Sequence, residues 1–342
     1  MTDTDAAPDS MARSSADSPL TADAAAELTA RLVDNVERVI VGHRDAVEHI
    51  LVALLARGHL LLEDVPGVGK TMLARAVATS LDGSFKRVQF TPDLLPSDVT
   101  GVNVFNEKTR EFEFQPGPVF ANVVLGDEIN RAPPKTQAAL LEVMEEEQVT
   151  VDGETHAVPD PFTVIATQND VEPGQTYELP VAEIDRFTKK IRMGYPTADE
   201  ETELLGRVAG EHPIESLDPV ASVEDVRRAR RTVADVTVSE PVRAYVSRLA
   251  SYTREHARLG ASPRGSIALV RASQARAVLA GREYVLPDDV QTEAPTVWSH
   301  RIRTDSDVDG AEIVDRALDT VPVERADEHP SDGSPVDDAA SE

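Results

Sequence analysis

Short apolar runs alternate with amphipathic and polar stretches through the first half of the chain. Residues 60–62 form a short buried-strand signal, and a loop and a helix over about 70–80 follow it. Further apolar runs stand at 88–90, 123–125 and 163–166. Alternation of short strands with helices predicts a mostly parallel sheet that is covered by helices.

Two stretches interrupt this alternation with a hairpin-like pattern, at about 101–114 and 148–158. After Pro196 the strand signals stop and only helical periodicity continues. The helical segments are expected at about 197–210, 222–234, 239–257 and 265–280, with another beginning after Pro287. We therefore predict an α/β core followed by a smaller α-helical domain.

The domain boundaries follow from these patterns and from the composition of the two ends. The α/β core is expected over residues 21–196 and the helical domain over 197–323. Residues 1–20 are rich in Ser, Ala and Asp, and residues 324–342 in Asp, Pro, Ser and Gly. Such segments cannot bury enough apolar surface to fold, so they predict a disordered leader and a disordered acidic tail.

Composition excludes several classes of chemistry. The chain has 342 residues and no cysteine, which rules out disulfides, thiolate metal sites and a cysteine nucleophile. The histidines show no zinc-protease spacing, and no hydrolase nucleophile motif occurs. No apolar run approaches the roughly 18 residues that span a bilayer, and the N-terminus lacks a secretory signal. These features predict a cytoplasmic protein without a membrane span.

The net charge of −27 bears on possible partners. Nucleic-acid affinity depends largely on Lys and Arg, so this charge makes a nucleic-acid partner unlikely. About half of the charge, −14, falls on residues 1–20 and 305–342, however, which leaves −13 on residues 21–304. Only six of the 34 basic residues are lysines, a composition typical of proteins from salt-adapted, haloarchaeon-like cells. The acidity can therefore reflect the solvent instead of the partner.

The most informative local pattern is a buried strand, a Pro/Gly loop and a helix over residues 60–71. Gly67 and Gly69 let backbone N–H groups converge on phosphate oxygens, and the helix start adds further donors. Lys70 can reach the β- and γ-phosphates of a nucleotide, and the Thr71 hydroxyl can ligate Mg²⁺. The first position of the general phosphate-loop pattern is Asp64 instead of Gly. A Gly-rich turn that merely caps a helix is the alternative.

A second apolar strand, over residues 121–126, leads into paired carboxylates. Asp127 can hold the Mg²⁺ shell and Glu128 can polarise an attacking water, two tasks that phosphoryl transfer to water requires. Taken alone, an Asp-Glu pair after a strand is more often a solvated helix start. The preceding phosphate loop favours the catalytic interpretation.

The order of four motifs resembles the MoxR family of AAA+ ATPases. They are Pro-Gly-Val-Gly-Lys-Thr (66–71), Gly-Asp-Glu-Ile-Asn-Arg-Ala-Pro-Pro (126–134), Ala-Thr-Gln-Asn (166–169) and Ile-Asp-Arg-Phe (184–187). The similarity runs from about Leu28 to Val323. It implies a P-loop nucleoside-triphosphatase core with a small α-helical lid, and an Mg²⁺-dependent ATPase that converts ATP and water to ADP and phosphate.

The resemblance adds three catalytic or sensing residues. Asn169 matches the sensor that orients water near the γ-phosphate. Arg186 matches the arginine finger that acts on a neighbouring subunit, and the resemblance therefore implies a ring, with six subunits as the expected number. Arg264 matches the lid arginine that contacts ATP across the cleft of its own chain. A surface ion pair is the alternative for Arg186, and a surface residue at a helix end is the alternative for Arg264.

The resemblance also implies a nucleotide-binding set. Val41 and Gly42 belong to the stretch that packs on adenine, while His43 stands where the family commonly carries Gln, which leaves its role open. The predicted cofactor-binding residues are Val41, Gly42, Pro66, Gly67, Val68, Gly69, Lys70, Thr71, Met72 and Arg264. Asn130 and Arg131, after Glu128, can either couple the catalytic Glu to neighbouring subunits or have a structural role, and both interpretations stay open.

Three functions remain open at this stage. The resemblance implies chaperone-like remodelling or maturation of a protein client, together with a partner that has a von Willebrand factor A domain. A nucleic-acid motor of the helicase-related clade shares the same core, and in such rings inserted hairpins often face the pore or the substrate. A scaffold that binds nucleotide but does not hydrolyse it is the third hypothesis.

Overall fold

Five parallel strands form the central sheet of the computed structural model, which describes residues 18–63, 67–168, 177, 179–208, 213–305 and 308–323. The strand order is β2 (Phe85–Gln89), β5 (Val123–Asp127), β8 (Thr163–Gln168), β1 (Leu60–Glu63) and β9 (Lys189–Ile191). Every neighbouring pair runs parallel, so the carboxyl ends of all five strands meet at one edge. The predicted parallel sheet is confirmed.

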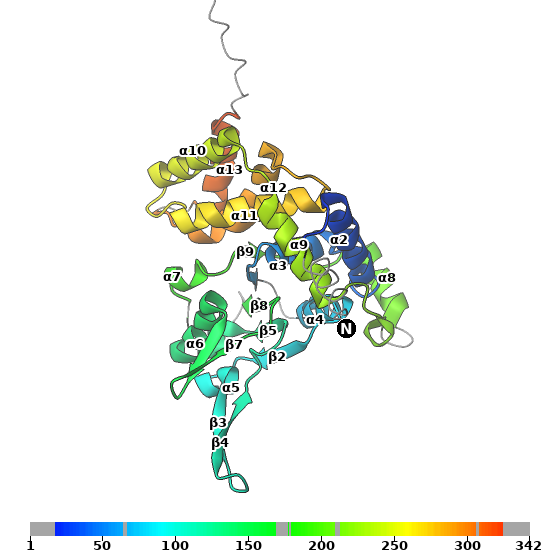
Figure 1. The fold of residues 1–342 in the computed structure, drawn as a ribbon. Helices are drawn as coiled ribbons and strands as arrows, with labels where there is room; N and C mark the ends of the chain where they lie inside the picture. Colours follow the sequence, from blue (N-terminus) through cyan, green and yellow to red (C-terminus); the bar gives the residue numbers. More distant parts are fainter. Residues whose placement is uncertain are drawn as a thin grey trace, which may run out of the picture.

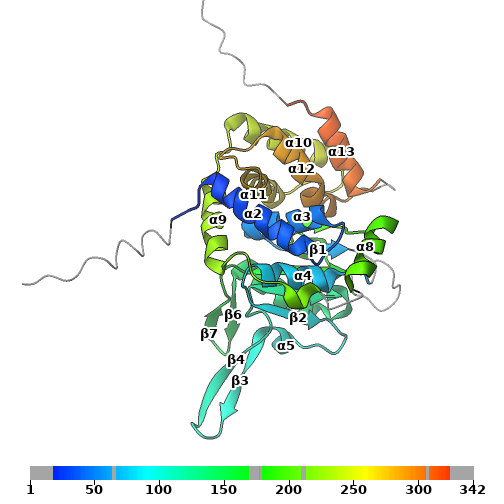
Figure 2. The same ribbon diagram turned by 90° about the vertical axis from the view of Figure 1, so that its right-hand side faces the viewer.

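Helices cover both faces of this sheet (Figures 1 and 2). Alternate residues of a strand point to opposite faces: Leu60 and Leu62 join one apolar cluster, whereas Leu61 joins the other. The helices before and between the strands are α2 (Ala22–Glu37), α3 (Arg44–Leu55), α4 (Lys70–Ser80), α5 (Pro96–Thr100), α6 (Pro134–Glu146) and α7 (Val181–Ile184). Helices α2, α3 and α4 share the first cluster, and α6 packs in the second.

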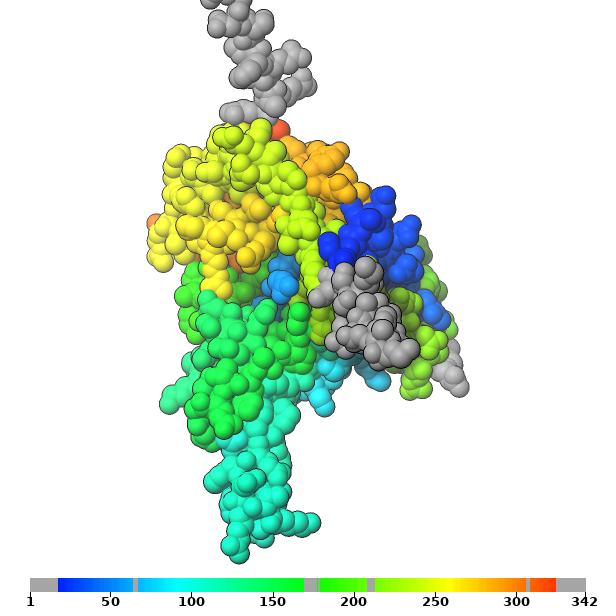
Figure 3. Space-filling view, in the orientation of Figure 1, coloured from blue at the N-terminus to red at the C-terminus, as the bar shows by residue number. Residues whose placement is uncertain are grey.

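Two antiparallel hairpins occur where the sequence predicts them. They are β3 (Gly101–Asn106) with β4 (Glu111–Pro116), and β6 (Gln148–Val151) with β7 (Glu154–Ala157). The first hairpin extends from the body as a separate arm, shown in cyan in Figure 3. Near its end Phe105 and Phe112 pair across the strands with ring centroids 5.4 Å apart, and Phe112 is 70% exposed.

The remaining helices form the C-terminal part of the molecule. They are α8 (Ala198–Val208), α9 (Val223–Asp235), α10 (Glu240–His256), α11 (Pro263–Leu279), α12 (Pro287–Trp298) and α13 (Gly310–Thr320). Trp298 is fully buried among them and donates its indole N–H to the Gly265 carbonyl at 2.9 Å. Helix α9 also contacts α2 and α3, so one apolar core runs from the sheet into the helical part.

Two of the sequence predictions concern chain ends or membrane crossing. Most of the predicted leader and the whole predicted tail, residues 1–17 and 324–342, lie outside the described residues. Within the described part of the chain, none of the helices combines the length and apolarity that crossing a bilayer requires.

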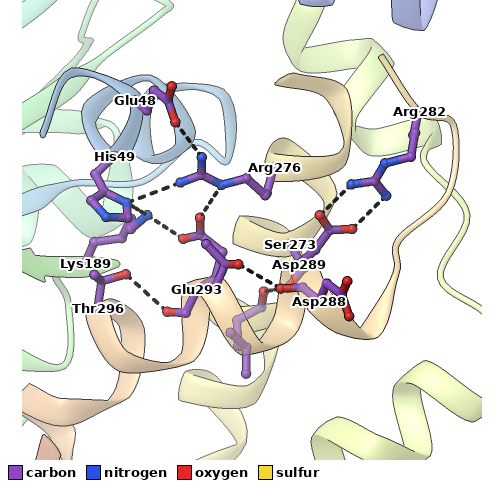
Figure 4. A network of polar contacts seen from close by, with 12 residues as sticks. Glu48, His49, Lys189, Ser273, Arg276, Arg282, Asp288, Asp289, Glu293 and Thr296 are labelled. Carbon is purple, nitrogen blue, oxygen red and sulfur yellow. Dashed lines mark hydrogen bonds and ion pairs between the residues drawn. The ribbon is translucent and has the colours of Figure 1, made fainter. Parts of the chain in front are cut away.

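A cluster of buried charges joins the edge strand β9 to α3, α11 and α12. We call it the buried charge cluster: Glu48, His49, Lys189, Arg276 and Glu293 (Figure 4). The side chains of Lys189 and Glu293 are fully buried and form an ion pair with each other. Arg276 donates to Glu293 Oε1 at 2.8 Å and to Glu48 Oε2 at 2.8 Å, so Glu293 is held by two cations.

Burial and charge set the protonation of this cluster. Burial lowers the pKa of Lys189 to about 8, although Glu293 opposes that shift. Burial alone would raise the pKa of Glu293, but Lys189 and Arg276 hold it below its ordinary value. Burial and the Lys189 charge lower the pKa of His49 to about 3, so a neutral imidazole accepts a hydrogen bond from Lys189 Nζ at 2.6 Å.

Replacing Glu293 by Gln tests how strongly this cluster holds the fold. We expect the free energy of unfolding to fall by about 3–5 kcal/mol, because two cations are left without their buried counter-ion. The measurement is chemical denaturation followed by circular dichroism. Glu48→Gln is the matched control at the partly exposed end of the same network, where a loss of about 1 kcal/mol or less is expected. Equal losses in the two variants would contradict this assignment.

Candidate nucleotide site

The phosphate loop lies between the end of β1 and the start of α4. Gly67 and Gly69 have φ angles of +89° and +93°, in the left-handed region that favours glycine. Helix α4 begins directly at Lys70, so its first backbone N–H groups have no acceptor within the helix. Lys70 is 8% exposed. This end of α4 therefore has the form of an anion site. Asp64 and Pro66 lie outside the described residues.

A cavity of about 300 Å³ opens beside the loop. It brings together several predicted residues from separate segments, and the second half of the chain supplies one wall. The lining residues are Val39, Ile40, Val41, His43, Gly67, Val68, Gly69, Met72, Pro196, Glu200, Leu204, Arg207 and Pro213. Apolar walls with a few polar groups suit a flat heteroaromatic base.

Gly42 lies between Val41 and His43, which line the cavity, and close to the Glu200 side chain. Its φ angle is +76°, and a Cβ built there would approach the Glu200 carboxylate to 2.2 Å. A side chain at this position would thus displace the Glu200 carboxylate, and the positive φ would strain the backbone of any residue other than glycine. His43 lines the cavity and also precedes the first turn of α3, without a side-chain bond that caps the helix.

The paired carboxylates lie where β5 ends, at the carboxyl edge of the sheet. Asp127 is the last residue of β5, and Glu128 follows in a left-handed conformation with φ +57°. Thr167 on the neighbouring strand β8 holds both: its hydroxyl donates to Asp127 Oδ1 at 2.7 Å and accepts from the Glu128 backbone N–H at 2.8 Å. One buried hydroxyl thus fixes the relative position of the two acids.

Strand β2 contributes further partners that the sequence analysis missed. Arg87 binds Asp127 Oδ2 through Nη2 at 2.6 Å and through Nε at 3.1 Å. Gln89 Nε2 donates to Glu128 Oε2 at 2.8 Å, and Arg131 Nη1 donates to the same oxygen at 2.9 Å. In sequence Arg87 and Gln89 are only polar neighbours of an apolar run. Their register opposite Leu125 and Asp127 gives them this role.

The oxygen donors of Thr71 and Asp127 are of the kind that Mg²⁺ prefers. Within the described ranges no three His, Cys, Asp or Glu side chains could jointly hold a metal. One protein carboxylate and one hydroxyl match the usual coordination of Mg²⁺, whose other ligands are water molecules and substrate phosphates. Arg87 occupies one Asp127 oxygen, so a cation there would compete with it.

Arg186 and Arg264 lie together, at the opposite edge of the sheet from the phosphate loop. Glu145 at the end of α6 binds both: Arg186 Nε is 3.1 Å from Oε2, and Arg264 Nη1 is 3.1 Å from Oε1. Arg186 precedes β9, whose first residue pairs with the first residue of β1, whereas the phosphate loop follows the last residue of β1.

This placement corrects the expectation for Arg264. We expected it to contact ATP across the cleft of its own chain, but it lies beside Arg186, with the length of the sheet between it and its own phosphate loop. The physical reason is the packing of α11 on α2, α3 and α9, which fixes where the first turn of α11 points. Asn169, predicted just after β8, lies outside the described residues.

Comparison with known proteins gives consistent results. Residues 59–189 match the ATPase family associated with various cellular activities (AAA), and residues 249–318 match the AAA lid domain. The chaperone MoxR1 of Mycobacterium tuberculosis is 40% identical over 322 residues, which cover 90% of this chain and 85% of MoxR1. The protein YeaC of Bacillus subtilis, described as uncharacterized, is 54% identical, covering 80% of this chain and 87% of YeaC.

The fold has a solved counterpart. A crystal structure of a protein from Cytophaga hutchinsonii, whose assignment as an ATPase is itself provisional, superposes with a TM-score of 0.83. The two sequences are 36% identical, and the match covers 89% of this chain and 97% of that one. An AAA+ core followed by an AAA lid is therefore confirmed for this chain.

Replacing Thr167 by Val tests the geometry of the two acids. The change removes the hydroxyl that bridges Asp127 and Glu128, and a displacement of catalytic groups by about 1 Å can cost about 10²-fold in rate. We expect the rate of ATP hydrolysis at saturating ATP to fall about 10- to 100-fold, with a smaller change in ATP affinity. Thr167→Ser keeps the hydroxyl and serves as the control. A Val variant as active as the Ser variant would refute the bridge.

Proposed function

Because the chain belongs to the MoxR family of AAA+ ATPases, we propose that it binds ATP with Mg²⁺ in the cavity beside the phosphate loop and hydrolyses it. The observation that carries this proposal is the position of Asp127 and Glu128, which Thr167 holds at the carboxyl edge of the sheet, one strand from β1 and the phosphate loop. The base would lie beside Val41 and Met72, which line the cavity, with Gly42 next to Val41 in the chain, and the phosphates would lie at the start of α4.

Each polar residue has a task in this proposal. Lys70 and the N–H groups of the loop neutralise the phosphates, and Thr71 and Asp127 hold Mg²⁺, which neutralises charge on the transferring phosphoryl group. Glu128 polarises the attacking water, and Asn169 orients it. Gln89 and Arg131 hold the Glu128 carboxylate.

The two arginines at the far edge imply an assembly. Arg186 and Arg264 cannot both lie beside Glu145 and reach the phosphates of their own chain, because the sheet separates the two places. We therefore assign both to the nucleotide of a neighbouring subunit in a ring, with six subunits as the expected number. Arginine suits this role because its charge is permanent and its donors form a planar fork.

The domain division at residue 196/197 is part of the same proposal. Pro196, Glu200, Leu204 and Arg207 form one wall of the cavity, so the start of the second unit would contact the bound base. Nucleotide binding would then bias the angle between the units, as in other hinge movements.

Glu128→Gln tests the catalytic assignment. We expect the variant to bind ATP and to release no phosphate above background, because the amide cannot polarise water as the carboxylate does. The measurements are ATP binding by equilibrium dialysis and phosphate release with and without Mg²⁺, at low salt and at molar KCl. Glu142→Gln, an exposed acid on α6, is the control. Unchanged phosphate release in Glu128→Gln would refute the assignment, and its absence from the unmodified assembled protein would favour a scaffold.

We further propose that ATP turnover remodels or matures a protein client, together with a partner that contains a von Willebrand factor A domain. The name of the chaperone relative supports this, as does the arm β3–β4 with its exposed pair Phe105 and Phe112. Apolar side chains presented on a projecting hairpin suit contact with a protein. The net charge of −27 and the sparse lysines disfavour the alternative, a nucleic-acid motor, and suit a salt-adapted source.

Affinity purification of the Glu128→Gln protein with ATP tests this role. We expect a von Willebrand factor A domain protein among the retained proteins, and less of it when Phe105 and Phe112 are both replaced by Ser. A double Ser replacement of the exposed Leu205 and Tyr195, away from the arm, is the control. A several-fold rise of ATPase activity with single- or double-stranded DNA would instead support the motor.

A further inference from the structure

A buried arginine of the lid binds the segment that carries Arg186. Arg301 lies at the end of the short 3-10 helix Ser299–Arg301, after α12, and is 4% exposed. Its Nε donates to Asp185 Oδ1 at 2.6 Å, directly before Arg186 in the chain. The side chain of the lid thus reaches the residue next to the proposed finger.

The other donors of Arg301 bind the backbone of the same segment. Nη2 donates to the Asp185 carbonyl at 3.0 Å and to the Phe187 carbonyl at 2.7 Å, and Nη1 donates to the Thr188 carbonyl at 3.1 Å. A guanidinium has five donors in a rigid plane, and Arg301 directs several of them at three residues that flank Arg186, namely Asp185, Phe187 and Thr188. The backbone on both sides of Arg186 is therefore fixed from the lid.

Neighbouring contacts strengthen the same connection. His300 Nε2 lies 3.1 Å from the Phe187 carbonyl, and Lys189 forms the ion pair with Glu293 of α12. Arg186 itself is tied through its side chain to Glu145, and both side chains are partly exposed. An ion pair between exposed groups holds a side chain weakly. A buried guanidinium that left its acceptors would be an unpaired charge out of water, which costs much more free energy.

We propose that Arg301 is a positioning residue for Arg186: through it the lid, together with the sheet to which Thr188 is bonded, determines where the finger is presented to the neighbouring subunit. This rests on the proposed action of Arg186 on that neighbour. It follows that a change of lid angle in one subunit moves the finger that the same subunit offers to the next nucleotide site.

Arg301→Lys tests the proposal, since lysine keeps the charge but cannot bind an aspartate and three carbonyls at once. We expect hydrolysis to fall about 10- to 100-fold, as for a displacement of about 1 Å. Arg186→Ala removes the finger and should lose about 10³-fold or more. Arg303→Lys is the matched control, because Arg303 lies in the same lid segment and, among the described residues, its side chain donates to the His300 and Ile302 carbonyls and not to the segment of Arg186.

Mixed rings separate positioning from general damage. Glu128→Gln subunits cannot hydrolyse but still offer an intact finger, so adding them should raise the rate per Arg301→Lys subunit several-fold. The Arg303→Lys protein should show no such rise. In a mixture of Arg301→Lys with Arg186→Ala the rate of ATP hydrolysis should not rise, because neither kind of subunit presents a correctly positioned Arg186. A merely structural defect in Arg301→Lys would not be relieved by a neighbour.

The remaining outcomes decide between the two proposals. If Arg186→Ala mixed with Glu128→Gln does not recover, the action of Arg186 on a neighbour is wrong. If that mixture recovers and Arg301→Lys does not, or if Arg301→Lys alone matches the Arg303→Lys control, the positioning role is wrong. Should Arg301→Lys fail to fold, Asp185→Asn removes the same contact from the finger side, and the same recovery is expected. Absence of recovery there overturns the inference.

Discussion

The pairing of Lys189 with Glu293 is the interaction on which the arrangement of the two halves depends. Both side chains are fully buried, and neither has water to stabilise its charge. Charges taken out of water are tolerated only with partners at bonding distance, so β9 and α12 must meet at this point. Arg276 extends the requirement to α3 through Glu48. The cluster therefore fixes the orientation of the lid on the α/β core. Apolar contacts alone would leave it less well defined, because they are not directional.

This constraint reaches both edges of the sheet. At the amino edge it anchors the start of β9, and Arg301 holds the preceding residues, so Arg186 is presented from a segment bound by the lid. At the carboxyl edge β9 leads to Pro196 and α8, which line the cavity beside the phosphate loop. Strand β9 thus connects the cavity in which the base would bind with the segment of Arg186, which would contact the neighbouring subunit.

The parts of the site that sequence could predict are those whose chemistry is local. Gly67, Gly69 and Lys70 belong to one turn, and Asp127 and Glu128 are adjacent, so spacing alone identifies them. Arg87, Gln89 and Thr167 could not be assigned this way, because their role comes from strand register between β2, β5 and β8. Arg264 was misplaced for a related reason: its helix is recognisable, but its direction is set by long-range packing.

The balance of charge explains why such a site would need a neighbour. Although the chain carries −27 overall, many of its arginines are engaged internally, as Arg87, Arg276 and Arg301 illustrate. Within one chain the phosphates would meet the N-terminus of α4, Lys70 and the proposed Mg²⁺. An arginine from a neighbour adds positive charge that further stabilises the transition state of phosphoryl transfer. Arg186 and Arg264, directed away from their own loop, can supply that charge only to another copy, so the same packing that separates them from their own site would make hydrolysis depend on assembly.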